Sequence, residues 1–297
     1  MVKTENLDWS WQWSWGLTAV TLLILLLYIR GRRHGRKQIS HPAHPAFFIG
    51  SITLLVLAWI FPLNILSNQL FSARVIQRIL LIGLIPFLFL LGNGPMIIHA
   101  GLPTILQQHL KSLPEQHPRL YTKLVELTKP SLSWLFFVCC VWLWYDEKLH
   151  QLTLNYQWLH NIESLLLLSA ALLYWWHILA VSPQIHEPMH PVIRILYAMI
   201  GSGPIKIVGF VLLFSTQSIY NYPATLQIRG LNINDENLGG IFIWLVGGIV
   251  FTWTAVYLAR EWLSLEDDKP YLPHSHWSAG EAMLAPGIRK PTVTKDQ

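Results

Sequence analysis

Ionisable side chains that could do chemistry sit at the ends of otherwise apolar runs in this 297-residue chain. Arg74 and Arg78 are four residues apart, and His160 and Glu163 are three apart, so on helices each pair would lie on one face. Polar side chains at membrane depth cost free energy unless they pair or face water. We predict that the following residues gather in one polar cluster: Arg74, Arg78, Asp146, Glu147, Glu163, Tyr220 and Asp235. Ion pairs that only stabilise the rim of a helix bundle are an equally open interpretation.

Histidines give the candidate metal ligands. Imidazole binds copper and zinc, and His150 and His160 flank the predicted cluster, so we predict these two as metal-ligating residues. Cys139 and Cys140 are adjacent and therefore point about 100° apart on a helix, which disfavours their binding one ion. The sequence contains no nucleophile–base–acid set, no phosphate-binding loop and no zincin motif, so we predict that it is not an enzyme.

Lys206 is the one charged residue inside an apolar run that covers residues 195–228. It follows Gly-Ser-Gly-Pro at 201–204, and these residues are expected to loosen or break a helix. The ammonium group could pair with a carboxylate or with unwound carbonyl groups. It could equally extend its side chain toward the membrane surface.

The elements that must position these residues are transmembrane helices. Hydrophobic residues make up 53% of the chain, charged residues only 12%, and the mean hydropathy is +0.39, whereas soluble domains carry about 25% charged residues. Seven apolar segments are long enough to cross a bilayer: 11–29, 46–66, 75–97, 131–146, 158–180, 195–219 and 239–260. The predicted fold class is an all-α polytopic membrane bundle.

Basic residues predict the orientation of this bundle. Of 21 Lys and Arg residues, 15 fall on one side of the predicted membrane and five on the other, which places the amino terminus outside and the carboxyl terminus in the cytoplasm. The predicted transmembrane domain covers residues 1–265 and includes a cytoplasmic amphipathic loop at 99–129; residues 266–297 form a flexible cytoplasmic tail. The basic excess therefore needs no nucleic-acid partner, and we predict a multi-pass protein of the cell (inner) membrane.

Three segments resemble the CtaG family, the seven-helix assembly factors of caa3-type cytochrome c oxidase. Residues 71–81 (FSARVIQRILL) and 85–95 (IPFLFLLGNGP) are similar to its third span. Residues 159–164 (LHNIES) with 174–176 (YWW) are similar to its fifth span, and 235–244 (DENLGGIFIW) to the entry of its seventh. The resemblance covers about residues 50–265.

The resemblance implies an integral membrane assembly factor for a haem–copper oxidase, acting in copper delivery or in holding a subunit during cofactor insertion. Its partners would be oxidase subunits and the lipid bilayer, with copper as the cofactor implied. The chain departs from the family pattern at Arg74 and Arg78, where histidines are expected, and at Ser164. Arginine cannot ligate copper, so a guanidinium could fill the metal's volume and pair with Glu163 or Asp235.

Two other functions remain open on the sequence. A small copper or organic-ion transporter could use Lys206 and the predicted helix break, because a broken helix near the midplane is a pointer to a transport site. A b-type haem enzyme would need histidine pairs in facing spans, and only His177 is well placed for that.

Overall fold

The computed structural model describes residues 14–34, 44–222 and 234–267, and in these residues the regular structure is helix. The helices in chain order are α1 (Trp15–His34), α2 (His44–Trp59), α3 (Leu63–Ser67), α4 (Phe71–Ile79), η1 (Leu80–Leu84), α5 (Ile85–Leu91), α6 (Gly94–Gly101), α7 (Thr104–Gln116), α8 (Pro118–Leu127), α9 (Pro130–Leu143), α10 (Glu147–Asn155), α11 (Gln157–Leu179), α12 (Pro191–Phe214), α13 (Asp235–Phe242), η2 (Ile243–Gly247) and α14 (Gly248–Asp267). The all-α membrane fold is confirmed.

Five helical segments are long and apolar enough to cross a membrane: Trp15–Arg33, Phe71–Leu91, Gln157–Leu179, Pro191–Phe214 and Asp235–Asp267. A sixth arises if α8 and α9, which are bent by 61°, form one span, and α2 is apolar but has only 16 residues. Each of the seven predicted segments thus contains helix, while the number of spans and their orientation stay predictions. The predicted tail lies outside the described residues except for the end of α14.

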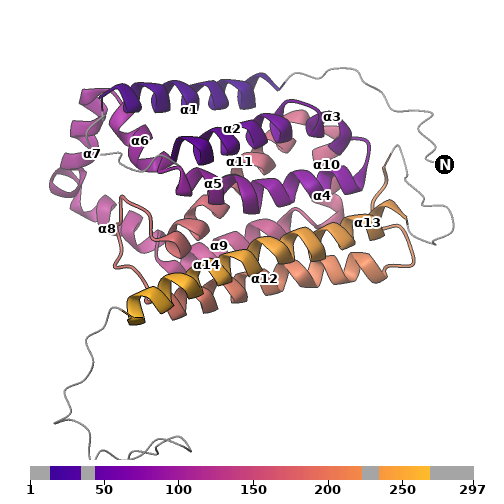
Figure 1. The fold of residues 1–297 in the computed structure, drawn as a ribbon. Helices are drawn as coiled ribbons and strands as arrows, with labels where there is room; N and C mark the ends of the chain where they lie inside the picture. Colours follow the sequence, from indigo (N-terminus) through magenta and orange to yellow (C-terminus); the bar gives the residue numbers. More distant parts are fainter. Residues whose placement is uncertain (1–13, 35–43, 223–233, 268–297) are drawn as a thin grey trace, which may run out of the picture.

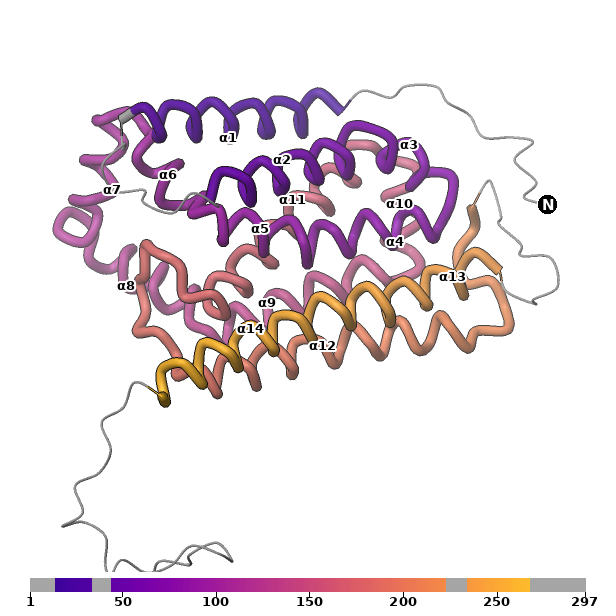
Figure 2. The backbone as a smooth tube through the Cα atoms, in the orientation of Figure 1, coloured from indigo at the N-terminus to yellow at the C-terminus, as the bar shows by residue number. Residues whose placement is uncertain are grey.

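The long helices run lengthwise between two ends of the bundle (Figure 1). One end carries α3, the start of α4, α10 and the start of α13, and the other carries α6, α7 and α8 (Figures 1 and 2). Neither α7 nor α8 contains a buried residue. We call the first end the α10 end. By the basic-residue count it is the predicted extracytoplasmic end.

Two of the long spans contain a π-helical turn, η1 between α4 and α5 and η2 between α13 and α14. Pro86, just after η1, has no N–H for the carbonyl oxygen of Ile82 four residues earlier. The Trp175 indole N–H donates to that oxygen at 2.7 Å. A side chain of the buried core therefore replaces the missing backbone hydrogen bond, and the span continues through the proline.

The Gly-Ser-Gly-Pro segment does not break its helix, so that prediction was wrong. α12 runs without interruption from Pro191 to Phe214 with Pro204 inside it. Packing explains the glycine at position 201, because a Cβ there would overlap the Tyr174 hydroxyl of α11. This glycine thus serves close helix packing, which membrane helices often achieve with small residues.

A buried arginine–glutamate cluster as candidate functional site

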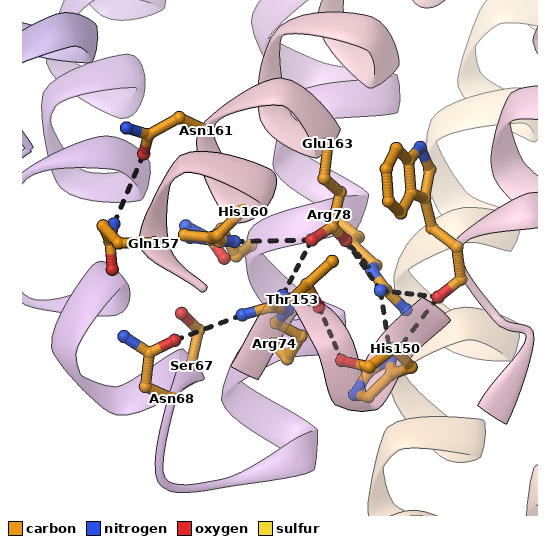
Figure 3. Close-up of polar contacts among 12 residues, drawn as sticks. Ser67, Asn68, Arg74, Arg78, His150, Thr153, Gln157, His160, Asn161 and Glu163 are labelled. Atoms are coloured by element: carbon orange, nitrogen blue, oxygen red, sulfur yellow. Dashed lines mark hydrogen bonds and ion pairs between the residues drawn. The ribbon is translucent and has the colours of Figure 1, made fainter. Parts of the chain in front are cut away.

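Three helices at the α10 end bring together a buried polar cluster, which we call the Arg–Glu cluster (Figure 3). α4 contributes Arg74 and Arg78, and α11 contributes His160 and Glu163. α10 crosses this end and contributes His150, with Thr153 one turn later. The spacings of four and three residues place each pair on one helix face, as the sequence predicted.

Glu163 lies between the two arginines and binds both. Its Oε2 accepts a hydrogen bond from an Arg74 terminal nitrogen at 2.7 Å, and its Oε1 accepts from Arg78 Nε at 2.7 Å. The side chains of all three residues are at most 3% exposed. Charge-assisted hydrogen bonds of this kind are about twice as strong as neutral ones, and removing one partner of a buried pair leaves an uncompensated charge.

The guanidinium groups of the two arginines also bind neutral acceptors on neighbouring segments. Arg74 donates to Thr153 Oγ1 at 2.5 Å and to Asn68 Oδ1 at 3.2 Å. Arg78 donates to the carbonyl oxygen of Trp144 at 2.7 Å, and its guanidinium carbon lies 4.6 Å from the centre of the Tyr145 ring. Two cations thus face one carboxylate, and carbonyl dipoles and an aromatic face stabilise the second positive charge.

His150 is held neutral by its neighbours. A guanidinium can only donate hydrogen bonds, so Nδ1 of His150 accepts from Arg78 at 3.1 Å, and its Nε2–H donates to the Tyr222 hydroxyl at 2.7 Å. Burial, and then the positive charges of Arg78 and Arg74, hold the pKa of His150 well below its ordinary value of 6.5. Both ring nitrogens are therefore used within the cluster.

His160 supports the carboxylate from the other side. Its Nδ1 lies 3.4 Å from Glu163 Oε2, and since a carboxylate only accepts, this nitrogen carries the proton. Its Nε2 lies 3.1 Å from the side-chain oxygen of Asn64 in α3. Sequence reasoning missed Asn64, Asn68 and Thr153, because they lie outside the predicted motifs. The spacing of Thr153, three residues after His150 and therefore on the same helix face, could have indicated its place in the cluster.

Asp235 is buried beside the cluster but does not pair with an arginine there. Its Oδ2 accepts from the backbone N–H of Phe71 at 2.6 Å and of Ser72 at 3.4 Å. It therefore stabilises the amino terminus of α4, where the helix dipole favours a negative charge. The predicted pairing of an arginine with Glu163 is present in the structure, and the alternative pairing with Asp235 is not.

Asp146 and Glu147 lie outside the cluster, so their predicted membership was wrong. Both are exposed, and Asp146 accepts from the backbone N–H of Leu149 at 3.0 Å as the N-cap of α10. Tyr220 is buried at the edge of the cluster, where its hydroxyl donates to the carbonyl oxygen of Tyr145 at 2.6 Å and its ring stacks on Phe71. Polar and acidic residues at the amino terminus stabilise a helix, and this explains Asp146 and Glu147 at the start of α10.

Lys206 lies on α12 away from the cluster. Its Nζ is 6.0 Å from the centre of the Trp244 ring, and among the described residues it forms no ion pair with a carboxylate. Of the two open alternatives for Lys206, pairing with a carboxylate is therefore absent in the described part of the chain.

The described residues contain no group of three or more His, Cys, Asp or Glu side chains that could hold a metal ion. Zinc sites use three or four such ligands. In the Arg–Glu cluster, two guanidiniums surround the carboxylate that a metal would need, and arginine has no lone pair to offer. The metal-ligating roles of His150 and His160 stay a prediction that this geometry does not favour.

Residues 22–264 match the family described as cytochrome c oxidase caa3 assembly factor (Caa3_CtaG). The chain belongs to this family. No curated protein and no solved structure shows a match to it. The family membership that the motifs predicted is thus confirmed. Together with the apolar helices, it identifies a multi-pass membrane protein whose family assembles a cytochrome c oxidase.

The Gly239–Gly240 pair that suggested Caa3_CtaG membership has a packing role. A Cβ at Gly239 would lie 2.6 Å from the Phe71 ring of α4, and one at Gly240 would lie 2.6 Å from the backbone nitrogen of Leu213 in α12. The two glycines therefore let α13 approach both helices closely. This approach brings Asp235 within reach of the first turn of α4, beside the Arg–Glu cluster.

Proposed function

We propose that this Caa3_CtaG member is a non-catalytic membrane scaffold that holds an oxidase subunit during assembly, and that it does so without binding copper in the Arg–Glu cluster. One observation carries the proposal: Glu163 binds Arg74 and Arg78 at once in a fully buried site. Membership of an assembly-factor family suggests a role outside catalysis.

The charges of the cluster support the scaffold role over copper delivery. A metal ion would place a further positive charge beside two guanidiniums that already exceed the one carboxylate. Because like charges repel strongly in a buried site, the cluster disfavours copper while both arginines are present. A rigid buried ion cluster instead fixes α4, α10 and α11 relative to one another, and this fixed end is the feature that a client protein would recognise.

The location and partners follow as part of the proposal. The distribution of basic residues supports an inner-membrane protein with the Arg–Glu cluster on the extracytoplasmic side, where it would meet oxidase subunits within the lipid bilayer. Nucleic acid has no role here. The transporter alternative loses its main support because α12 is continuous, and a transport site of that kind depends on a broken helix.

The test is deletion of the gene followed by complementation, with oxidase content measured from the haem spectrum of isolated membranes. We expect the deletion to lower oxidase content, the full chain to restore it, and copper added to the medium to have no effect. Full restoration by copper alone would contradict the scaffold role and indicate copper delivery. Unchanged oxidase content in the deletion strain would reject both functions.

A further inference from the structure

Lys206 is a partly exposed cation of α12 that forms no ion pair with a carboxylate of the described residues. Lys206 is eight residues from Phe214, the last residue of the helix, and this corresponds to about 12 Å of helix. Its ammonium group stays at this depth, because it lies over the ring of Trp244, which is nine residues into the paired span that begins at Asp235. The charge is therefore inside the predicted hydrocarbon region rather than at its edge.

The surface around this cation is apolar and exposed. α12 and α14 run side by side along the outside of the bundle (Figure 1). Met199, Gly203 and Phe210 lie on the same side of α12 as Lys206, since they recur at intervals of three and four residues. Met199 is 43% and Phe210 is 52% exposed. Such a surface suits lipid or another helix, whereas a cation on it needs a negative partner.

Three glycines of α12, η2 and α14 leave room for another backbone. A Cβ at Gly203, Gly247 or Gly248 would meet nothing within 4 Å, in contrast to Gly209, where it would lie 2.7 Å from Ile243. Gly209 thus serves the internal packing of α12 on η2, while the other three have open space beside them in the described part of the chain. Small residues with open space beside them allow close approach of two membrane helices. A lipid chain has no need of them.

The π-helical turn η2 places Trp244 beside Lys206. π-turns within α-helices are rare and are frequent at functional sites. The ring covers one side of the ammonium group, and a cation–π contact of this kind orients the cation without neutralising it. The opposite charge must come from outside the described residues.

We infer that the face formed by Lys206, Gly203 and Trp244 is a docking site for a transmembrane helix of an oxidase subunit that carries an aspartate or glutamate at the matching depth. Charge complementarity selects this helix, and the open space beside Gly203 admits its backbone. The inference rests on the proposed scaffold function, and it adds to the α10 end a second surface, within the membrane, by which the subunit is held.

Photo-crosslinking in intact membranes tests the docking site. The photoreactive residue p-benzoylphenylalanine, a close analogue of phenylalanine, is placed at Phe210 in the full chain, and at Phe47 of α2 as a control position. We expect position 210, and not position 47, to crosslink to an oxidase transmembrane segment that contains a carboxylate. Lys206→Met should reduce this crosslink at least tenfold, Lys206→Arg should preserve it, and the exposed control Lys123→Met in α8, at the other end of the bundle, should leave it unchanged.

Several results would overturn the docking site. These are an equal crosslink yield in Lys206→Met, a crosslinked helix without a carboxylate, crosslinks to a second copy of this chain, and crosslinks to lipid only. Retention of phosphatidylglycerol that depends on Lys206, with no effect on the protein crosslink, would assign the cation to a lipid phosphate instead.

The variants separate this inference from the scaffold function. Lys206→Met removes a charge from an apolar surface, so we expect it to accumulate like the parent; Lys206→Gln is a second neutral variant. If the deletion lowers oxidase content but neither neutral variant changes the crosslink, only the docking site is wrong. If the deletion leaves oxidase content unchanged, the scaffold function is wrong and the docking site fails with it.

Discussion

Replacing Glu163 with glutamine removes the one carboxylate that binds two buried guanidiniums. The amide keeps a single oxygen, which can accept from Arg74 or from Arg78, and its NH2 group then faces the other arginine as a donor. One guanidinium nitrogen then faces a donor instead of an acceptor, and both buried cations lose the negative charge that compensates them. Loss of one partner of a buried ion pair costs about 3–5 kcal/mol, and we expect Glu163→Gln to lose this much stability.

Thermal unfolding of the purified full chain in detergent, followed by tryptophan fluorescence, measures the effect. For a chain of this size the expected loss lowers the unfolding midpoint by about 10 °C. Glu147→Gln is the matched control, since Glu147 is exposed at the same end of the bundle, and it should cost less than about 1 kcal/mol. Equal midpoints for Glu163→Gln and Glu147→Gln would refute the reasoning, because burial would then have no energetic role.

Three further changes test other parts of the structure. Because the pKa of His150 is lowered in the folded chain, its contribution to stability is complete above pH 6.5 and is lost as the pH falls toward the lower folded value. His150→Asn should flatten this loss of stability with falling pH. An unchanged slope of stability against pH would show that His150 is not its source. A Cβ at Gly31 would overlap a backbone carbonyl of α6, so Gly31→Ala should cost about 1–3 kcal/mol, whereas Gly16→Ala, with open space, should be neutral in the same melt. Asp235→Ala should lower stability by about 1–2 kcal/mol through loss of its hydrogen bonds to the first turn of α4, and a variant as stable as the parent would contradict that role.

The sequence predicted the elements and the centre of the site because both follow from local patterns. Apolar runs without charges identified the membrane helices, and the spacings of Arg74–Arg78 and His160–Glu163 placed each pair on one face. Because the arginines and Glu163 carry opposite charges at the same predicted depth, we expected them to form ion pairs. The structure adds that these side chains are buried, which the sequence alone left open.

The errors concern residues whose role depends on tertiary packing. Asp146 and Glu147 are close in sequence to His150, but the turn before α10 directs them outward, where Asp146 caps the helix. Gly201 and Pro204 favour a helix break by local propensity, yet contacts with Tyr174 and neighbouring helices keep α12 continuous. Composition and spacing do not contain these contacts, because they depend on which helices become neighbours.

The most direct test of the central claim is the copper content of the purified full chain after incubation with cuprous ions, measured by elemental analysis. If Arg74 and Arg78 hold Glu163 in place of a metal, the chain retains no stoichiometric copper, and His160→Ala gives the same result. One copper ion bound per chain, and lost in His160→Ala, would contradict the claim.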